Sequence, residues 1–196
     1  MAKTTTTFLD ELIGAARGCL ALIVGDRQSS AYFDFRQTGL VGSFIALVVA
    51  LAVQAFGPQL LGIPTPSGVA GGVVILGALV IGVQFGIAWI VLRQLGRSDG
   101  FIPFVVVQNW ATMFQAVLAV ALIGIFGQPI AIEPGGEMAQ LTSGSIPFIV
   151  LGIAALVISV NIARLILTLK PLHVALFVSA QLTTALVIQP ILGMAL

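Results

Sequence analysis

Long apolar runs, separated by short connections rich in glycine, proline or charge, make up the chain from residue 39 onwards. A helix needs about 20 predominantly apolar residues to cross the hydrocarbon core of a bilayer, which is about 30 Å thick. Five runs have about this length, and we expect membrane-spanning helices over residues 39–56, 69–92, 102–126, 147–167 and 172–192. The pattern therefore predicts an all-α membrane protein, a bundle of five transmembrane helices.

A different pattern occupies residues 8–24, where apolar side chains recur at spacings of three and four. Asp10, Glu11 and Arg17 fall elsewhere on the helical wheel, so this stretch predicts an amphipathic helix. Such a helix can lie on the membrane surface or pack on the cytoplasmic face of the protein itself, and the sequence leaves both positions open. We divide the chain into a cytoplasmic N-terminal segment, residues 1–38, and a five-helix transmembrane domain, residues 39–196.

Glycine and proline mark the expected ends of the spans. Gly57 and Pro58 follow the first span, and Gly127 follows the third. Pro171 separates the fourth span from the fifth, where its missing N–H costs nothing because the first turn of a helix has no partner for it. We expect the first span to end before Pro58.

Composition excludes a soluble protein. Hydrophobic residues make up 59% of the 196 residues and charged residues only 8%, whereas about a quarter of the residues of a soluble domain are charged. The net charge of +1 leaves no broad basic face for nucleic acid. We therefore expect no nucleic-acid partner.

The distribution of positive charge predicts the orientation. Cytoplasmic loops of membrane proteins carry an excess of Lys and Arg. All eight positive residues precede the first span, lie between the second and third, or lie at the end of the fourth, whereas the opposite connections hold only Glu133 and Glu137. The sequence therefore predicts a multi-pass protein of the cytoplasmic (inner) membrane with its N-terminus in the cytoplasm and its C-terminus on the periplasmic side.

Polar side chains inside the apolar runs are the candidate functional residues, because a polar group in lipid is costly without a partner. They form a candidate intramembrane polar layer consisting of Gln84, Gln108, Asn109, Gln115, Asn161, Arg164 and Gln181, with Gln54 as a further amide in the first span. Two interpretations remain open. The amides can hydrogen-bond between helices and hold the bundle together, or they can line a polar cavity that opens to the cytoplasm.

Arg164 is the one formal charge placed within a predicted span. It lies about one turn from the cytoplasmic end of that span, so its side chain can snorkel to the lipid headgroups. Alternatively it pairs with Asp26, Asp34 or Asp99 of the cytoplasmic segments. The first interpretation makes it a membrane-surface residue and the second makes it a fastening between segments.

The sequence carries no recognisable catalytic, cofactor or metal signature. Paired carboxylates, a Ser/His/Asp set and a phosphate-binding glycine loop are all absent, and a single cysteine, Cys19, offers neither a disulfide nor a metal site. We therefore expect no enzyme activity, no cofactor and no metal. The expected function is a membrane-organising scaffold or accessory subunit that contacts membrane lipids, a membrane-protein partner or further copies of itself. The alternative is a small permease or channel subunit for an uncharged or weakly polar solute.

The turn before the third span, Leu95–Phe101, is rich in glycine and charge, and the span that follows carries Gln108, Asn109 and Trp110. This stretch, together with the charged N-terminal segment and five close-packed spans, resembles the Yip (Ypt-interacting protein) family of membrane proteins, including its bacterial members. The resemblance implies a non-enzymatic role in membrane organisation or trafficking-like scaffolding. It implies no site residues.

Overall fold

The computed structural model describes residues 7–64, 68–132, 139–142 and 144–195. Within these residues the helices are α1 Phe8–Val24, α2 Gln37–Leu60, α3 Val69–Gln94, α4 Phe101–Phe126, α5 Ser145–Asn161 and α6 Pro171–Ala195. Short 3-10 helices, η1 Ser29–Tyr32 and η2 Ser98–Gly100, lie in two of the connections, and a π-helical turn, η3 Ile162–Ile166, continues α5. Strands β1 Ile130–Ile132 and β2 Ala139–Leu141 pair antiparallel, with Ile130 opposite Leu141.

The helices fit a membrane location. Among the described residues four helical segments are long and apolar enough to cross a bilayer: Gln37–Leu60, Val69–Gln94, Ser98–Phe126 and Ser145–Ile166. The described apolar part of α6, Pro171–Val187, is shorter. The structure thus shows a helical protein with several membrane-compatible helices, and the number of crossings depends on α6.

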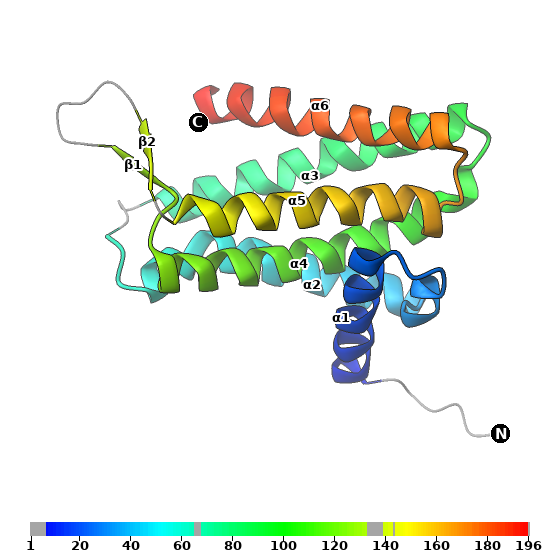
Figure 1. Ribbon diagram of the computed structural model, residues 1–196, viewed down its shortest axis with the longest axis horizontal. Helices are drawn as coiled ribbons and strands as arrows, with labels where there is room; N and C mark the ends of the chain where they lie inside the picture. The colour runs from blue at the N-terminus through cyan, green and yellow to red at the C-terminus, as the bar shows by residue number, and fades with distance from the viewer. Residues whose placement is uncertain (1–6, 65–67, 133–138, 143, 196) are drawn as a thin grey trace.

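Helices α2 to α6 run along the long axis of the molecule, and α1 projects from their side near one end (Figure 1). Helix α2 packs mainly against α3 and α4, α3 packs against α6, and α5 contacts both α4 and α1. Helix α1 therefore lies across helices that are separated from it by most of the chain.

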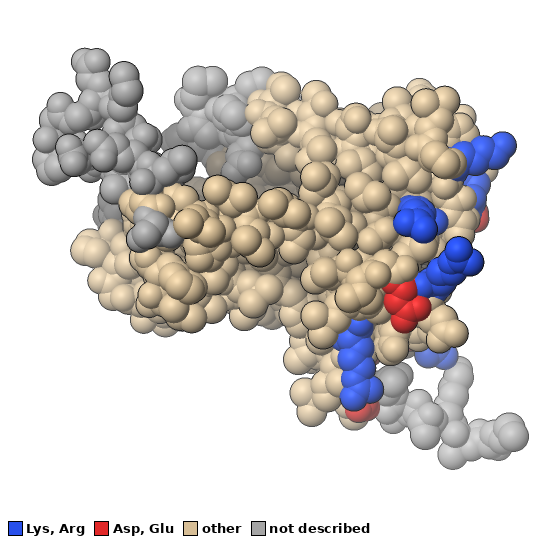
Figure 2. Space-filling view, in the orientation of Figure 1, with Lys and Arg blue, Asp and Glu red and all other residues tan. Residues whose placement is uncertain are grey.

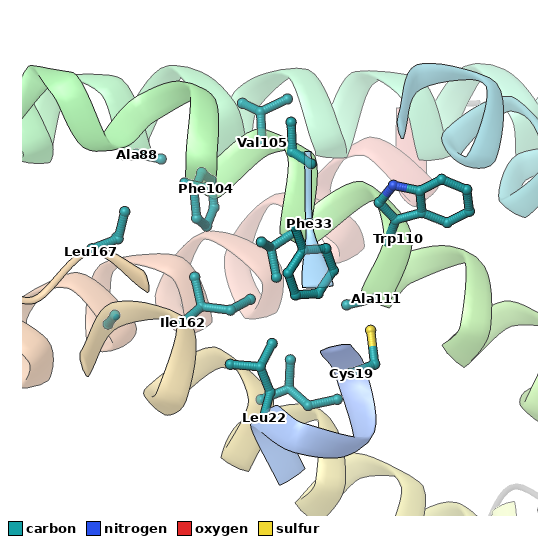
Figure 3. Close-up of a cluster of buried hydrophobic side chains, with 14 of the residues drawn as sticks. Cys19, Leu22, Phe33, Ala88, Phe104, Val105, Trp110, Ala111, Ile162 and Leu167 are labelled. Carbon is teal, nitrogen blue, oxygen red and sulfur yellow. The ribbon is translucent and has the colours of Figure 1, made fainter. Parts of the chain in front are cut away.

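The hydrophobic core lies toward the end that carries α1. Its members include Leu22 of α1, Phe104 and Trp110 of α4, Ile162 of η3 and Phe177 of α6, all of which are buried. Figure 3 shows several of these side chains converging between the helices. In water such a cluster is stabilised mainly by the burial of apolar area. Within a membrane it is stabilised mainly by close packing of the side chains. The core fastens α1 to the bundle.

Local capping explains where α1 begins and ends. The hydroxyl of Thr7 accepts a hydrogen bond from the Asp10 N–H at 3.3 Å, and the Asp10 carboxylate accepts one from the Thr7 N–H at 3.1 Å. This capping box satisfies N–H groups that have no partner within the helix. At the other end Gly25 adopts a φ of 74°, a left-handed conformation that costs glycine little and ends the helix.

The end of one span and the helix type within another differ from the sequence-based expectation. Helix α2 continues through Pro58 to Leu60. Because Pro58 lies in the last turn, it removes one helical hydrogen bond, and Leu61 N–H still reaches the Gly57 and Pro58 carbonyls at 3.2 Å. The fourth predicted span changes from α-helix to the wider π-helix after Asn161. Such π-turns frequently accompany functional positions in helices.

Candidate functional site

Three of the predicted amides lie around one small cavity. Gln84 of α3, Gln108 of α4 and Gln181 of α6 line a space of about 90 Å³ together with Ser159 of α5. The Gln181 side-chain N–H donates to the Gln84 backbone carbonyl at 3.2 Å, and Gln108 donates to the Thr112 hydroxyl at 3.5 Å. The first of these hydrogen bonds links α6 to α3, and the second joins successive turns of α4.

Asn109 joins α4 to α2. Its side chain is buried, and its Nδ2 donates to the Ser43 hydroxyl at 3.1 Å. The Ser43 hydroxyl in turn donates to the Leu40 carbonyl at 2.8 Å. The Asn109 Oδ1 is buried and has no hydrogen-bond partner among the described residues. Asn109 thus holds two helices together and keeps one acceptor free.

Asn161 fastens the bundle to the N-terminal helix. Its buried Nδ2 donates to the Leu22 carbonyl at 2.7 Å, a contact between residues 139 apart in the chain. Leu22 lies in the last turn of α1, where carbonyl groups lack the usual helical partner, and its carbonyl otherwise accepts from the Gly25 N–H at 3.2 Å. Asn161 therefore caps α1 from the end of α5, and it stands apart from the amides around the small cavity.

Arg164 is exposed on η3. The ion pairs of the described residues join Arg36 to Asp34 and Arg97 to Asp99, so the alternative interpretation, in which Arg164 pairs with Asp34 or Asp99, is not observed among these residues. Asp26 accepts a hydrogen bond from the Gln28 N–H instead of binding Arg164. Arg164 therefore carries its positive charge at the surface, without an ion pair among the described residues.

Arg97 links two connections of the bundle. Its guanidinium donates to the Thr168 hydroxyl at 2.9 Å and to the Thr168 carbonyl at 3.3 Å. Thr168 has a φ of 49°, a left-handed conformation that is unusual for a residue other than glycine. Arg97 thus ties the α3–α4 connection to the α5–α6 connection.

Gln54 and Gln115 lie in a separate groove. With Thr112 they line a space of about 410 Å³ between α2, α4 and α5, which small side chains such as Ala119 and Gly152 also border. Gln108, Thr112 and Gln115 follow one another on α4 at spacings of four and three, and the structure divides them between the small cavity and this groove. The polar layer is therefore several separate sites.

A polar cavity of about 310 Å³ lies between α1 and the start of α2, lined by Asp10, Glu11, Asp34 and Arg36 among others. Hydrogen bonds from Arg36 lower the pKa of Asp34 to about 2. Partial burial, followed by the charge of Asp34, raises the pKa of Glu11. Within the described chain no three His, Cys, Asp or Glu side chains are grouped so that they could hold a metal ion.

The sequence did not identify several residues that organise these sites. Ser43 and Ser159 are single hydroxyls inside apolar runs, and only their position in a span marks them as polar partners. The Leu22 carbonyl belongs to the backbone, so no side chain marks it in the sequence as the partner of Asn161. Comparison with known proteins gives no match: no family model, no curated protein and no solved structure is significantly similar to the chain.

Proposed function

We propose that this chain is a non-catalytic integral membrane protein that acts through protein or lipid contacts, as a membrane-organising scaffold or accessory subunit. The observation that supports this proposal is that a hydrogen bond and a shared hydrophobic core hold α1 against the bundle. The buried Asn161 caps α1, and Leu22 and Cys19 belong to the same core as the spans. A helix held in this way presents a fixed surface beside the membrane.

The proposal includes five crossings, with α6 as the fifth, in the inner membrane. On the face shown in Figure 2 the Lys, Arg, Asp and Glu side chains gather at the end that carries α1. Positive residues favour the cytoplasmic side of short connections. This distribution supports a cytoplasmic N-terminus, and an odd number of crossings then places the C-terminus on the far side.

The surface of α1 supports an interfacial position for this helix. Leu9, Ile13 and Leu20 are 61%, 45% and 64% exposed and follow one side of α1 at spacings of four and seven. Arg17 is also exposed. An apolar stripe with charged neighbours is typical of helices that lie in the plane of the headgroups.

The resemblance to the Yip family adds a role in membrane organisation to this proposal. The stretch that carries the resemblance, Leu95–Phe101, contains Arg97, whose guanidinium holds Thr168. The α3–α4 connection therefore also holds the α5–α6 connection in place. A partner protein or a second copy of the chain would bind next to it, on the side where the charges gather.

Purification in mild detergent tests the proposed function. We expect a defined homo-oligomer or a stoichiometric companion membrane protein, measured by light scattering and mass spectrometry. Deletion of residues 1–24 should abolish the association, whereas Arg164→Gln should leave it intact if α1 is the binding element. A monomer without a companion that conducts a solute selectively in liposomes would contradict the proposal.

A second candidate function, a small permease, is favoured by the groove that holds Gln54 and Gln115. Its volume of about 410 Å³ is within the range of small-molecule sites, and its amides can bind an uncharged solute. Liposome uptake of small polyols or amides tests this function. Gln115→Leu should abolish selective uptake, whereas Gln181→Leu, outside the groove, should preserve it. Equal leakage through both variants would rule it out.

A further inference from the structure

An apolar groove of about 290 Å³ lies between α1 and the facing surfaces of α4 and α5. Its three walls are formed by α1, α4 and α5, which contribute Leu20, Leu118 and Ala154 respectively. Its floor lies where α1 crosses α4, and Figure 3 shows Cys19 and Ala111 next to each other there. Apart from Gln115 and the Cys19 thiol, the described side chains that line it are apolar. A polar ligand would therefore lose its hydrogen bonds in this groove.

The surroundings of the groove are also apolar. Helices α4 and α5 belong to segments that are apolar enough to cross a membrane. Leu20 lies both in the groove and on the exposed apolar stripe of α1. Leu118 is 51% exposed, so the α4 wall continues onto the outer surface of the bundle. Hydrocarbon from the surrounding bilayer can therefore enter the groove without crossing a polar barrier.

The shape of the groove suits a flexible occupant. Its walls leave about 290 Å³ between three helices. A hydrocarbon chain is thinner than an α-helix, which is about 10 Å across with its side chains, and can follow these walls.

A positive side chain stands beside the groove. Arg17 directly follows Ala16 and precedes Leu20 by three residues, and both of these neighbours line the groove. Arg17 is exposed and has no ion-pair partner among the described residues. A guanidinium at this level matches the phosphate of a lipid headgroup, which it can bind through two parallel hydrogen bonds.

We propose that this groove binds one acyl chain of an anionic bilayer phospholipid beneath α1, with Arg17 holding the headgroup phosphate. The bound lipid fills the space between α1 and the spans, and so becomes part of the surface that the protein presents. This inference rests on the proposed membrane function and names lipid as a bound component.

Native mass spectrometry of the full chain, released from detergent after successive washes, tests the site. The wild type should keep about one phospholipid per chain. Ala154→Phe fills the groove and should lose this lipid, whereas Ala78→Phe, the same change on the exposed side of α3, should keep it. Leu20→Gln adds a polar group at an exposed groove position and should reduce retention several-fold with little effect on folding.

The headgroup contact has its own measurement. After exchange into nanodiscs of equal phosphatidylglycerol and phosphatidylcholine, the wild type should retain phosphatidylglycerol several-fold more often. Arg17→Gln should remove this preference and Arg17→Lys should keep part of it. A wild type without retained lipid, or equal retention by Ala154→Phe and Ala78→Phe, would overturn the site. Neither result affects the companion-protein test, so the two proposals can fail separately.

Discussion

At the residue scale, single polar side chains connect helices that are far apart in the chain. Asn109 bonds to Ser43, Gln181 bonds to the Gln84 carbonyl, and Asn161 bonds to the Leu22 carbonyl. Interhelical hydrogen bonds of this kind contribute about 0.6 to 2 kcal/mol each within membranes. Their main effect is to determine which helices pack together and how those helices are offset along their axes.

Asn161→Ala should loosen α1. The change leaves the Leu22 carbonyl with only the Gly25 N–H, at 3.2 Å, as partner, and should lower the free energy of unfolding by about 1 kcal/mol. Burial raises the pKa of the Cys19 thiol to about 12, so this thiol should resist maleimide in the intact protein and react faster in the variant. The measurement is the labelling rate at pH 7.5. Gln181→Ala is the control, and an increase of the same size there would contradict the role of Asn161.

Arg97 and Arg164 should differ in their effect on stability although both are near the charged end. Arg97→Ala removes two hydrogen bonds to Thr168, and should lower thermal stability in detergent by about 1 to 2 kcal/mol. Arg164→Ala changes an exposed side chain that has no ion pair with any described residue, and its stability should stay within about 0.5 kcal/mol of the wild type. Thermal unfolding followed by tryptophan fluorescence compares them. A larger loss for Arg164→Ala would show that this residue has a partner in the membrane-embedded protein.

The residue scale also shows which parts of the site a sequence can predict. Gln84, Gln108, Asn109 and Asn161 are recognisable because amides are rare in apolar runs. Their partners are not recognisable, since the Leu22 and Gln84 acceptors are backbone carbonyls that every residue has. Asn161 was assigned to the same layer as the glutamines from its depth along the span. The neighbour that it contacts depends instead on the direction in which its side chain points around the helix axis.

At the element scale, hydrophobic periodicity located the helices better than their ends. Helix α1 occupies Phe8–Val24, the range that the spacing of apolar residues indicates. The predicted end of the first span was wrong, because a proline disturbs the turn before it and leaves the N–H groups after it, such as that of Leu61, able to continue the helix. The π-helical turn η3 has no sequence signal, since it depends on how the end of α5 packs against its neighbours.

The packing of α1 depends on the close contact between Gly18 and the Phe33 ring. A Cβ at this position would lie 2.5 Å from two ring carbons of Phe33, which is itself buried. Gly18→Leu should therefore push α1 away from η1 and expose the connection between α1 and α2 to protease. Limited trypsin digestion in detergent, with cleavage at Arg27 and Arg36, is the measurement. Gly82→Leu adds the same side chain on α3 where nothing lies within 4 Å, and should leave the digestion pattern unchanged.

At the scale of the whole molecule, the two ends of the bundle differ. The described core is concentrated near α1, and the larger groove with Gln54 lies further along α2, α4 and α5. Charged side chains gather at the α1 end of the face shown in Figure 2. A bilayer distinguishes such ends, because positive residues are retained on the cytoplasmic side during insertion. The end of the bundle that contacts α1 is therefore the end that we expect to face the cytoplasm.

Topology gives the most direct test at this scale. All eight Lys and Arg residues fall on one side of a five-span arrangement, so an alkaline phosphatase reporter fused after Leu196 should be active, because it reaches the periplasm. A reporter inserted after Ser98, in the α3–α4 connection, should be inactive, and a cytoplasmic fluorescent reporter at the same two positions should give the opposite pattern. If α6 does not cross, the fusion after Leu196 becomes cytoplasmic while the insertion at Ser98 keeps its side. If both results were inverted, the whole protein would have the opposite orientation, because both reporter positions would then lie on the other side of the membrane.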